Sequence, residues 1–242
     1  MADRRRFLQG LSTLPLVGNL FAAKAGVDYA KRDLLGELGV KPFINAAGTY
    51  TMLTASLMPP EVMTAMQAVS RKFVHLNKLQ DAAGAKIAQM LECDAAMVTS
   101  GCAAALACGT AGVLTGTNQK FIRQLPDLTG MKTEVIVQKK HRNGYDHAVR
   151  LCGVKLIEIE TVEEFERAVN ANTAMTFFAN FAEPEGQIKA EDWVKLSKKH
   201  NLPSLTDCSA DTPPPERLFR YTKMGFDLVA FSGGKGICGP QS

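Results

Sequence analysis

A lysine set among glycines is the residue of this sequence whose chemistry is easiest to name. Lys235 follows an apolar run over residues 228–231 and stands between Gly234 and Gly236. Glycines let the backbone approach a ligand closely and place no side chain over the amine. Burial beside a ligand disfavours the ammonium form and leaves a neutral amine that can bond to an aldehyde. The segment predicts a Schiff-base lysine, with a solvated loop lysine as the alternative.

A carboxylate closes the preceding apolar run. Asp207 ends the predicted strand 204–207, and Lys235 lies just beyond the predicted strand 228–231. Ligands of open parallel sheets bind beyond the carboxyl ends of the strands, where these two side chains would meet. A carboxylate there can pair with a protonated pyridine nitrogen and keep that ring electron-withdrawing. A helix cap or a turn is the alternative role for Asp207.

Two further segments follow predicted strands. Ser100-Gly101-Cys102-Ala103 opens a predicted helix, where free backbone N–H groups and the helix dipole suit a phosphate. His141 lies in the basic run 139–142, and its imidazole could stack on a pyridine ring. Tyr145 and His147 compete for that stacking role, and a solvated basic loop is the alternative.

The elements that position these residues follow from apolar periodicity. Strands are predicted at 95–99, 134–138, 155–159, 174–179, 204–207 and 228–231. Helices are predicted at about 61–72, 81–91, 101–114, 144–152, 162–170 and 191–200. This alternation predicts an α/β fold with a mostly parallel sheet sandwiched by helices.

Length, charge and cysteine usage limit the classes of function. A chain of 242 residues can bury one good-sized core. The formal charge is +4, but without the first 25 residues 24 basic and 23 acidic side chains remain. This balance gives no electrostatic footprint for nucleic acid. The six cysteines have neither disulfide-framework nor zinc-site spacing, so we expect no metal site and predict buried, apolar cysteines.

The first 25 residues have the pattern of an export signal. Arg4, Arg5 and Arg6 precede an apolar run over residues 11–21 and the small-residue step 23–25. The run is too short to span a membrane as a helix, so no stable membrane insertion is expected. The arginines resemble a twin-arginine signal, which predicts a periplasmic location. An amphipathic N-terminal helix on a cytoplasmic protein is the alternative.

Three segments carry a resemblance to one enzyme family. They are Ile44-Asn-Ala-Ala-Gly48, the run 98–105 around Ser100-Gly101-Cys102, and the run 231–241 with Ser232 and Lys235. They look like the fold-type I enzymes that use pyridoxal 5'-phosphate (PLP). Within these they resemble the selenocysteine synthase-related branch, which includes seryl-tRNA(Sec) selenium transferase and D-glucosaminate-6-phosphate ammonia-lyase. The likeness covers about residues 40–242.

The resemblance implies PLP as the cofactor and assigns a role to each residue. Lys235 would form the aldimine with the cofactor, and Asp207 would pair with its pyridinium nitrogen. Ser232 would contact the phosphate together with the backbone at the start of the helix. The expected cofactor-binding set is Ser100, Gly101, Cys102, Ala103, His141, Asp207, Ser209, Ser232 and Lys235.

Two departures from the family pattern bear on function. Residues 53–58 lack the arginine motif of the selenium transferases, and only the leader precedes the shared region, without their tRNA-binding domain. We therefore do not expect tRNA as the substrate. Glu183 stands where relatives often carry an asparagine, three residues before the glycine matched by Gly186. Asn180 is the candidate substitute for contact with the cofactor's phenolic oxygen.

By this resemblance we expect a PLP-dependent enzyme that acts on a small amino acid or amino sugar acid. Ammonia-lyase-like α,β-elimination is the leading reaction, while transamination, racemisation and selenium transfer stay open. An inactive or truncated fragment is also open, because relatives continue through a C-terminal small domain. The expected organisation is a leader at 1–25, an N-terminal segment at 26–72 and an incomplete PLP-binding large domain at 73–242. A homo-oligomer is implied, because relatives build their sites at dimer interfaces.

Overall fold

The computed structural model describes residues 31–240, and the predicted export signal lies outside them. The chain divides into two compact units, residues 1–46 and residues 47–242. The described part of the first unit holds one short helix, α3 (Leu34–Glu37). Asp33 caps this helix, because its side chain accepts a hydrogen bond of 2.9 Å from the Gly36 N–H.

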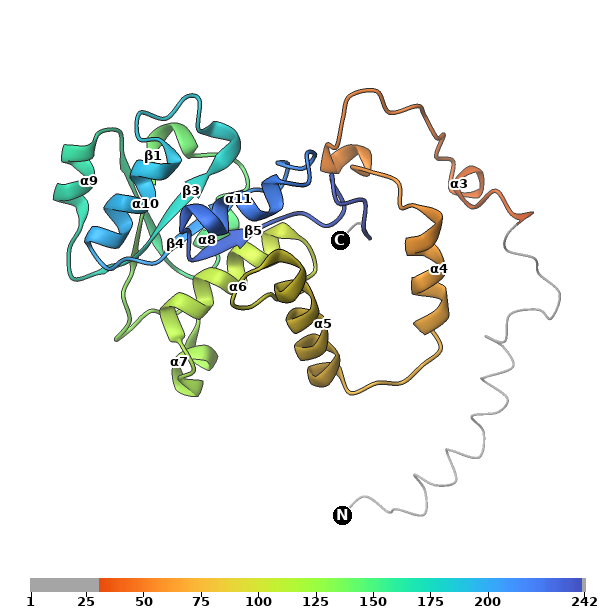
Figure 1. Ribbon diagram of the computed structural model, residues 1–242, viewed down its shortest axis with the longest axis horizontal. Helices are drawn as coiled ribbons and strands as arrows, with labels where there is room; N and C mark the ends of the chain where they lie inside the picture. The colour runs from red at the N-terminus through yellow and green to blue at the C-terminus, as the bar shows by residue number, and fades with distance from the viewer. Residues whose placement is uncertain (1–30, 241–242) are drawn as a thin grey trace, which may run out of the picture. The chain divides into compact units, whose positions relative to one another are not determined.

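A parallel sheet forms the centre of the second unit (Figure 1). Its five strands lie side by side in the order β2-β1-β3-β4-β5, and every neighbouring pair is parallel. The strands are β1 (Glu134–Gln138), β2 (Lys155–Ile159), β3 (Thr173–Ala179), β4 (Ser204–Asp207) and β5 (Leu228–Ala230). The predicted parallel sheet is confirmed, and the bounds of β1, β2 and β4 coincide with the predicted ranges.

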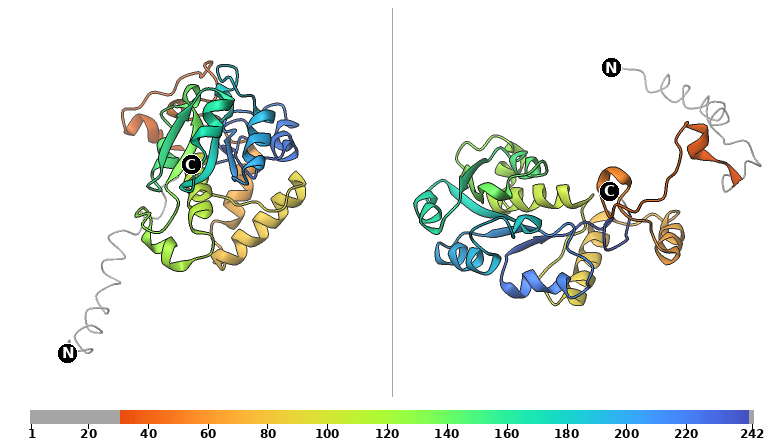
Figure 2. Two further views of the ribbon diagram at one scale, coloured as in Figure 1. Left: turned by 90° about the vertical axis from the view of Figure 1, so that its left-hand side faces the viewer. Right: turned by 90° about the horizontal axis from the view of Figure 1, so that it is seen from above.

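Helices cover both faces of this sheet (Figure 2). Apolar side chains point alternately to either side of each strand, so both faces of the sheet are apolar and need to be covered. In β1, Val135 and Val137 pack with α6 and α8, whereas Ile136 packs on the side of α9, α10 and α11. The first pair of helices is α6 (Cys102–Thr115) and α8 (His147–Arg150). The others are α9 (Val162–Ala168), α10 (Ala190–Lys199) and α11 (Arg217–Met224). The predicted α/β sandwich is confirmed.

The remaining helices precede the sheet or join its elements. They are α4 (Pro60–Val69), α5 (Leu76–Leu91) and α7 (Gln119–Gln124), with short 3-10 turns at η2 (Thr51–Leu53), η3 (Lys139–His141) and η4 (Asn180–Ala182). Neither α7 nor α11 was predicted. The parallel strands β4 and β5 need a crossover between them, and α11 lies in that crossover.

One predicted strand is wrong. Residues 95–99 do not form a strand, since no other strand of residues 31–240 pairs with them. The Gln80 side chain instead donates to the Val98 carbonyl at 2.6 Å, so α5 lies against this segment. Met97 is 64% exposed and Val98 is 50% exposed, which leaves an apolar segment uncovered.

The cysteines are more exposed than predicted. All six are free thiols, but only Cys152 and Cys208 are buried, while Cys108 on α6 is exposed. Short apolar side chains were expected in the core. On α6, Leu106 and Thr110 are buried, and the helix turns Cys108, which lies between them in sequence, to its solvent side. Among residues 31–240, no helix is long and apolar enough to cross a membrane.

Candidate active site

A pocket lies where β4 ends and the Lys235 loop begins, and it gathers eight of the nine predicted cofactor-binding residues. Its lining consists of Thr51, Ser100, Gly101, Cys102, Ala103, Leu106, Tyr145, Asp207, Ser209, Ser232 and Lys235. Of the predicted set, His141 is the member that does not line it. The carboxyl end of a parallel strand thus holds these groups, as the position of ligands in open α/β sheets predicts.

Asp207 is the buried carboxylate of the pocket. It is 4% exposed and follows Thr206 at the end of β4. Its Oδ1 accepts hydrogen bonds from the Ser209 N–H at 2.9 Å and from the Cys102 thiol at 3.7 Å. No hydrogen bond from residues 31–240 reaches Oδ2. One carboxylate oxygen is therefore held by the protein, and the other is left for a donor.

Ser209 links Asp207 to Lys235. The Lys235 Nζ donates to the Ser209 Oγ at 3.2 Å, and the backbone N–H of the same serine binds Asp207. The lysine and the carboxylate therefore face one small space, with a single residue touching both. An amine and a carboxylate arranged in this way can contact opposite ends of one small aromatic ring.

The loop that carries Lys235 folds back on itself. The Cys238 N–H donates to the Lys235 carbonyl at 2.9 Å, and the Gly239 N–H donates to the Gly233 carbonyl at 2.6 Å. A Cβ at Gly236 would lie 1.9 Å from the Thr212 carbonyl oxygen, whereas a Cβ at Gly233 would meet no atom within 4 Å. Of these two positions, only 236 requires a glycine, because the Thr212 backbone approaches it closely.

Gly236→Ala is accordingly expected to destabilise the chain by roughly 1–3 kcal/mol, because two backbone segments must separate. Gly233→Ala, in the same loop, is expected to change the free energy of unfolding by less than about 0.5 kcal/mol. Urea unfolding of both variants measures the difference. Equal effects of the two substitutions would mean that the loop does not pack against Thr212 as described.

The start of α6 provides the predicted anion site. Gly101 is the N-cap at φ 93°, a left-handed conformation that favours glycine, and no side chain caps the helix. The first N–H groups of a 14-residue helix are thus without a capping side chain at the pocket wall. Together with the helix dipole they suit a phosphate.

Sequence reasoning missed the loop that carries Thr51 into the pocket. Ser56 fastens this loop to the lysine loop, because its N–H and its Oγ both donate to the Gly234 carbonyl, at 3.2 and 2.7 Å. Thr54 and Ala55 have φ values of 61° and 52°. Two successive non-glycine residues in the left-handed region cost on the order of 1–2 kcal/mol each. Threonine and alanine do not favour this conformation, so the turn could not be predicted from the residue types.

His141 is placed away from the pocket, so its expected stacking position is not reproduced. The η3 turn directs the ring into the core, where it is 0% exposed and packs edge-on against Phe178 with centroids 4.4 Å apart. Its Nδ1 accepts a hydrogen bond of 3.2 Å from the Ala179 N–H. Tyr145, which competed for the stacking role, lines the pocket, whereas His147 does not.

Burial, with the Lys189 cation adding a smaller effect, lowers the pKa of His141 from 6.5 to about 4. An unfolded chain binds a proton at this residue below pH 6.5, and the folded chain does not until about pH 4. The free energy of unfolding should therefore fall as pH falls through this window, by roughly 1.4 kcal/mol per pH unit from this group alone.

His141→Gln is expected to flatten that pH dependence in urea unfolding, although it also lowers stability at neutral pH. His147→Gln is the matched control, because His147 is exposed and lies six residues away. Identical slopes for wild type and both variants would contradict a neutral, buried imidazole.

The two residues discussed for the phenolic oxygen lie outside the pocket lining. Glu183 accepts a hydrogen bond of 3.0 Å from the Ala190 N–H and so caps the start of α10. The Asn180 Nδ2 donates to Asp211 at 2.6 Å, while its Oδ1 is buried without a hydrogen-bond partner. In this structure Glu183 has a helix-capping role and Asn180 supports the loop after β4.

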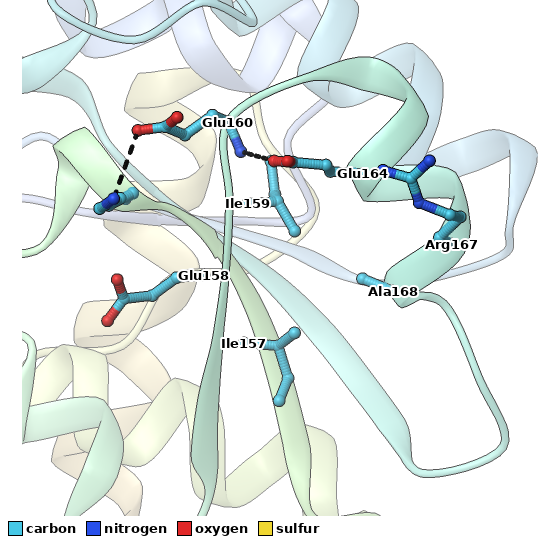
Figure 3. Close-up of a pocket in the computed structure, with 8 residues that line it drawn as sticks. Ile157, Glu158, Ile159, Glu160, Glu164, Arg167 and Ala168 are labelled. Atoms are coloured by element: carbon cyan, nitrogen blue, oxygen red, sulfur yellow. Dashed lines mark hydrogen bonds and ion pairs between the residues drawn. The ribbon is translucent and has the colours of Figure 1, made fainter.

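A larger hollow lies at the outer edge of the sheet, beside β2 (Figure 3). Three of its charged residues already have partners, since Glu164 accepts from the Glu160 N–H at 2.7 Å and Lys139 pairs with the Glu160 carboxylate at 3.9 Å. It combines neither a lysine with a buried carboxylate nor a free helix start. The smaller pocket is therefore the candidate active site.

Comparison with known proteins gives several similarities in sequence and fold. No family model matches the chain. It is 28% identical over 221 residues to D-glucosaminate-6-phosphate ammonia lyase from Salmonella typhimurium, a match that covers 87% of this chain and 59% of that protein. It is also 28% identical over 110 residues to L-seryl-tRNA(Sec) selenium transferase from Mannheimia succiniciproducens, which covers 38% of this chain and 24% of that protein.

Solved structures agree with these similarities. The structure of a D-glucosaminate-6-phosphate ammonia-lyase superimposes with a TM-score of 0.78 at 27% identity, covering 85% of this chain and 58% of that one. A serine palmitoyltransferase with a bound PLP–myriocin aldimine shares the fold with a TM-score of 0.52 at 15% identity, covering 79% and 51%. The chain spans about three fifths of the ammonia lyases that it matches. Its described part has the fold of the fold-type I pyridoxal-phosphate enzymes, and its sequence is similar to D-glucosaminate-6-phosphate ammonia lyase.

Proposed function

We propose that this chain binds PLP through Lys235 and acts as a lyase on a small amino acid or amino sugar acid. The observation that carries the proposal is the contact of Ser209 with both Lys235 and Asp207 inside one pocket. A Schiff-base lysine and a ring-nitrogen partner must reach the same small ring. Because Ser209 contacts both side chains, Lys235 and Asp207 lie no further apart than the length of one serine residue allows. The similarity to an ammonia lyase supports the reaction class.

The residues of the pocket fit three polar groups of PLP: the aldehyde, the ring nitrogen and the phosphate. The Lys235 amine is suited to the aldehyde carbon, and the unpartnered Oδ2 of Asp207 is suited to the ring N–H. The start of α6 and the Ser232 hydroxyl are suited to the phosphate. When bound, the cofactor supplies an electron sink for the carbon next to the substrate amine.

Lys235 has a second task in this proposal. With cofactor and substrate bound, a Lys235 Nζ that is not bonded to the cofactor would be placed to accept the proton of the substrate α-carbon. Ser209 Oγ holds that nitrogen at 3.2 Å and so limits where the free amine can swing. Loss of a β-substituent after proton removal is the leading outcome, with transamination and racemisation as the other reactions open to the same residues.

The experiment that tests the proposal is an absorbance spectrum of the purified chain with added PLP, before and after sodium borohydride. We expect a visible band that borohydride removes, with one PLP fixed to the chain. Mass spectrometry of the digested product should find the label on Lys235. A label spread over surface lysines, or no saturable band, would refute specific cofactor binding.

Selenium transfer is the second candidate, favoured by the match over 110 residues to a selenium transferase. An enzyme of that kind must bind seryl-tRNA, and tRNA binding weakens steeply with salt. Filter binding of seryl-tRNA at two salt concentrations separates the candidates. We expect no salt-dependent binding, and a steep slope would favour the second candidate.

We also propose that the chain forms a homo-oligomer. Large apolar side chains on α4 and α5 lie open to solvent, and exposed apolar side chains on these helices favour an interface that covers them. Those more than half exposed are Met63, Val69, Leu76, Leu79 and Met90. Light scattering after gel filtration is expected to give at least twice the chain mass.

Export by the twin-arginine route remains a proposal that depends on the leader sequence. Arg5→Lys with Arg6→Lys is expected to retain the protein in the cytoplasm, because receptors of that route read the arginine pair. Cell fractionation measures the change. Periplasmic protein at an unaltered level would contradict this route.

A further inference from the structure

Cys102 opens α6 and lines the pocket, and its thiol donates to the buried carboxylate of Asp207 at 3.7 Å. We propose that Cys102 is a positioning residue for Asp207. Its thiol and the Ser209 N–H together hold Oδ1, so that Oδ2 is the oxygen presented to the ring nitrogen of bound cofactor. This inference rests on the proposed function and assigns to the Cys102 side chain a task separate from phosphate contact.

The two donors reach Oδ1 from different elements. The Ser209 N–H comes from the loop after β4 at 2.9 Å, and the Cys102 thiol comes from the start of α6 at 3.7 Å. Donors from two directions fix both torsion angles of a short carboxylate side chain. One donor alone would leave the carboxylate free to rotate about it.

The second oxygen then has a defined position and no partner among residues 31–240. Asp207 is 4% exposed, but its Oδ2 is not among the fully buried oxygens without a partner, so this oxygen opens onto the pocket that Asp207 lines. A ligand that brings an N–H or O–H group into the pocket can donate to it. The proposed cofactor would bring such a donor in its protonated ring nitrogen.

The thiol is suited to donating rather than to nucleophilic attack. Burial raises the pKa of Cys102, and the charge of Asp207 and the hydrogen bond to it raise that pKa further, against a smaller opposing effect of Lys235. The thiol therefore keeps its proton at neutral pH. A thiol is also a weaker donor than a hydroxyl, so it can hold Oδ1 while leaving most of the charge available at Oδ2.

The first test uses the chain without cofactor. The rate at which iodoacetamide alkylates Cys102 is followed by mass spectrometry of its peptide in wild type and in Asp207→Asn. Loss of the neighbouring charge should raise the rate, by about tenfold for each unit by which the thiol pKa falls. Asp211→Asn is the matched control, because Asp211 is also buried in the loop after β4 but contacts Asn180 instead. Equal Cys102 rates in wild type and Asp207→Asn would overturn the contact.

The second test is a double-mutant cycle on PLP affinity. Cys102→Ala should weaken binding by about three- to tenfold, the size expected for one hydrogen bond. The same substitution in an Asp207→Asn background should change affinity by less than about twofold. Cys152→Ala is the control, since Cys152 is buried and its thiol donates to the Ala107 carbonyl instead.

These outcomes separate the positioning role from the proposed function. Wild type that binds PLP while Cys102→Ala binds it equally well would overturn the role of Cys102 and leave the proposed function standing. An equal loss in both backgrounds would also overturn that role, because the thiol would then act independently of Asp207. Wild type that binds no PLP would overturn the proposed function, and the alkylation test would still decide the contact.

Discussion

Replacing Lys235 by alanine is expected to lower turnover by about 10³-fold or more. In the proposed function the substitution removes the amine that would hold the cofactor aldehyde and, once released, would take the substrate proton, so both tasks would be lost together. No other lysine lines the pocket, so the described residues offer no second amine for either task. Release of ammonia from a small amino acid or amino sugar acid with a β-leaving group measures the effect.

Lys195→Ala is the matched control for this substitution. Lys195 lies on α10 with its side chain 73% exposed and pairs with Asp192. It should keep wild-type turnover and stability. Lys235→Ala should keep the wild-type thermal unfolding midpoint in the absence of cofactor, and borohydride should no longer fix PLP to the chain. A tenth of wild-type turnover remaining in Lys235→Ala would show that another group is the reactive amine.

The sheet was predictable because buried parallel strands consist of short, mostly apolar runs of residues. Residues 134–138, 155–159 and 204–207 become β1, β2 and β4 at the predicted bounds. Residues 95–99 are also a short apolar run but form no strand in the part of the chain described here, and Met97 and Val98 are exposed. A strand needs a neighbouring strand with free backbone groups, which lies far away in sequence and which an apolar run alone does not reveal.

The site was predictable to the extent that it depends on strand ends. Asp207 ends one strand and Lys235 follows another, and parallel strands bring such residues to one edge of the sheet. His141 follows a strand as well, but a single 3-10 turn directs its ring into the core beside Phe178. Thr51 lies more than 150 positions before Asp207 and enters the pocket through a strained turn. Both outcomes depend on loop conformation, which residue types along one sequence do not determine.

Replacing Asp207 by asparagine is expected to lower turnover by about 10²–10³-fold, the size found when one preorganised polar contact to developing charge is removed. An amide has nearly the shape of the carboxylate but carries no charge, so it cannot stabilise a proton on a bound ring nitrogen. PLP should still be fixed to Lys235 by borohydride, which separates this loss from that of the lysine. Asp227→Asn is the control, because Asp227 accepts from Ser204 at 2.8 Å, where β4 begins rather than where it ends. Turnover of Asp207→Asn within about fivefold of wild type would mean that the reaction does not need a charged partner at the ring, and would favour a role for Asp207 in the loop after β4 alone.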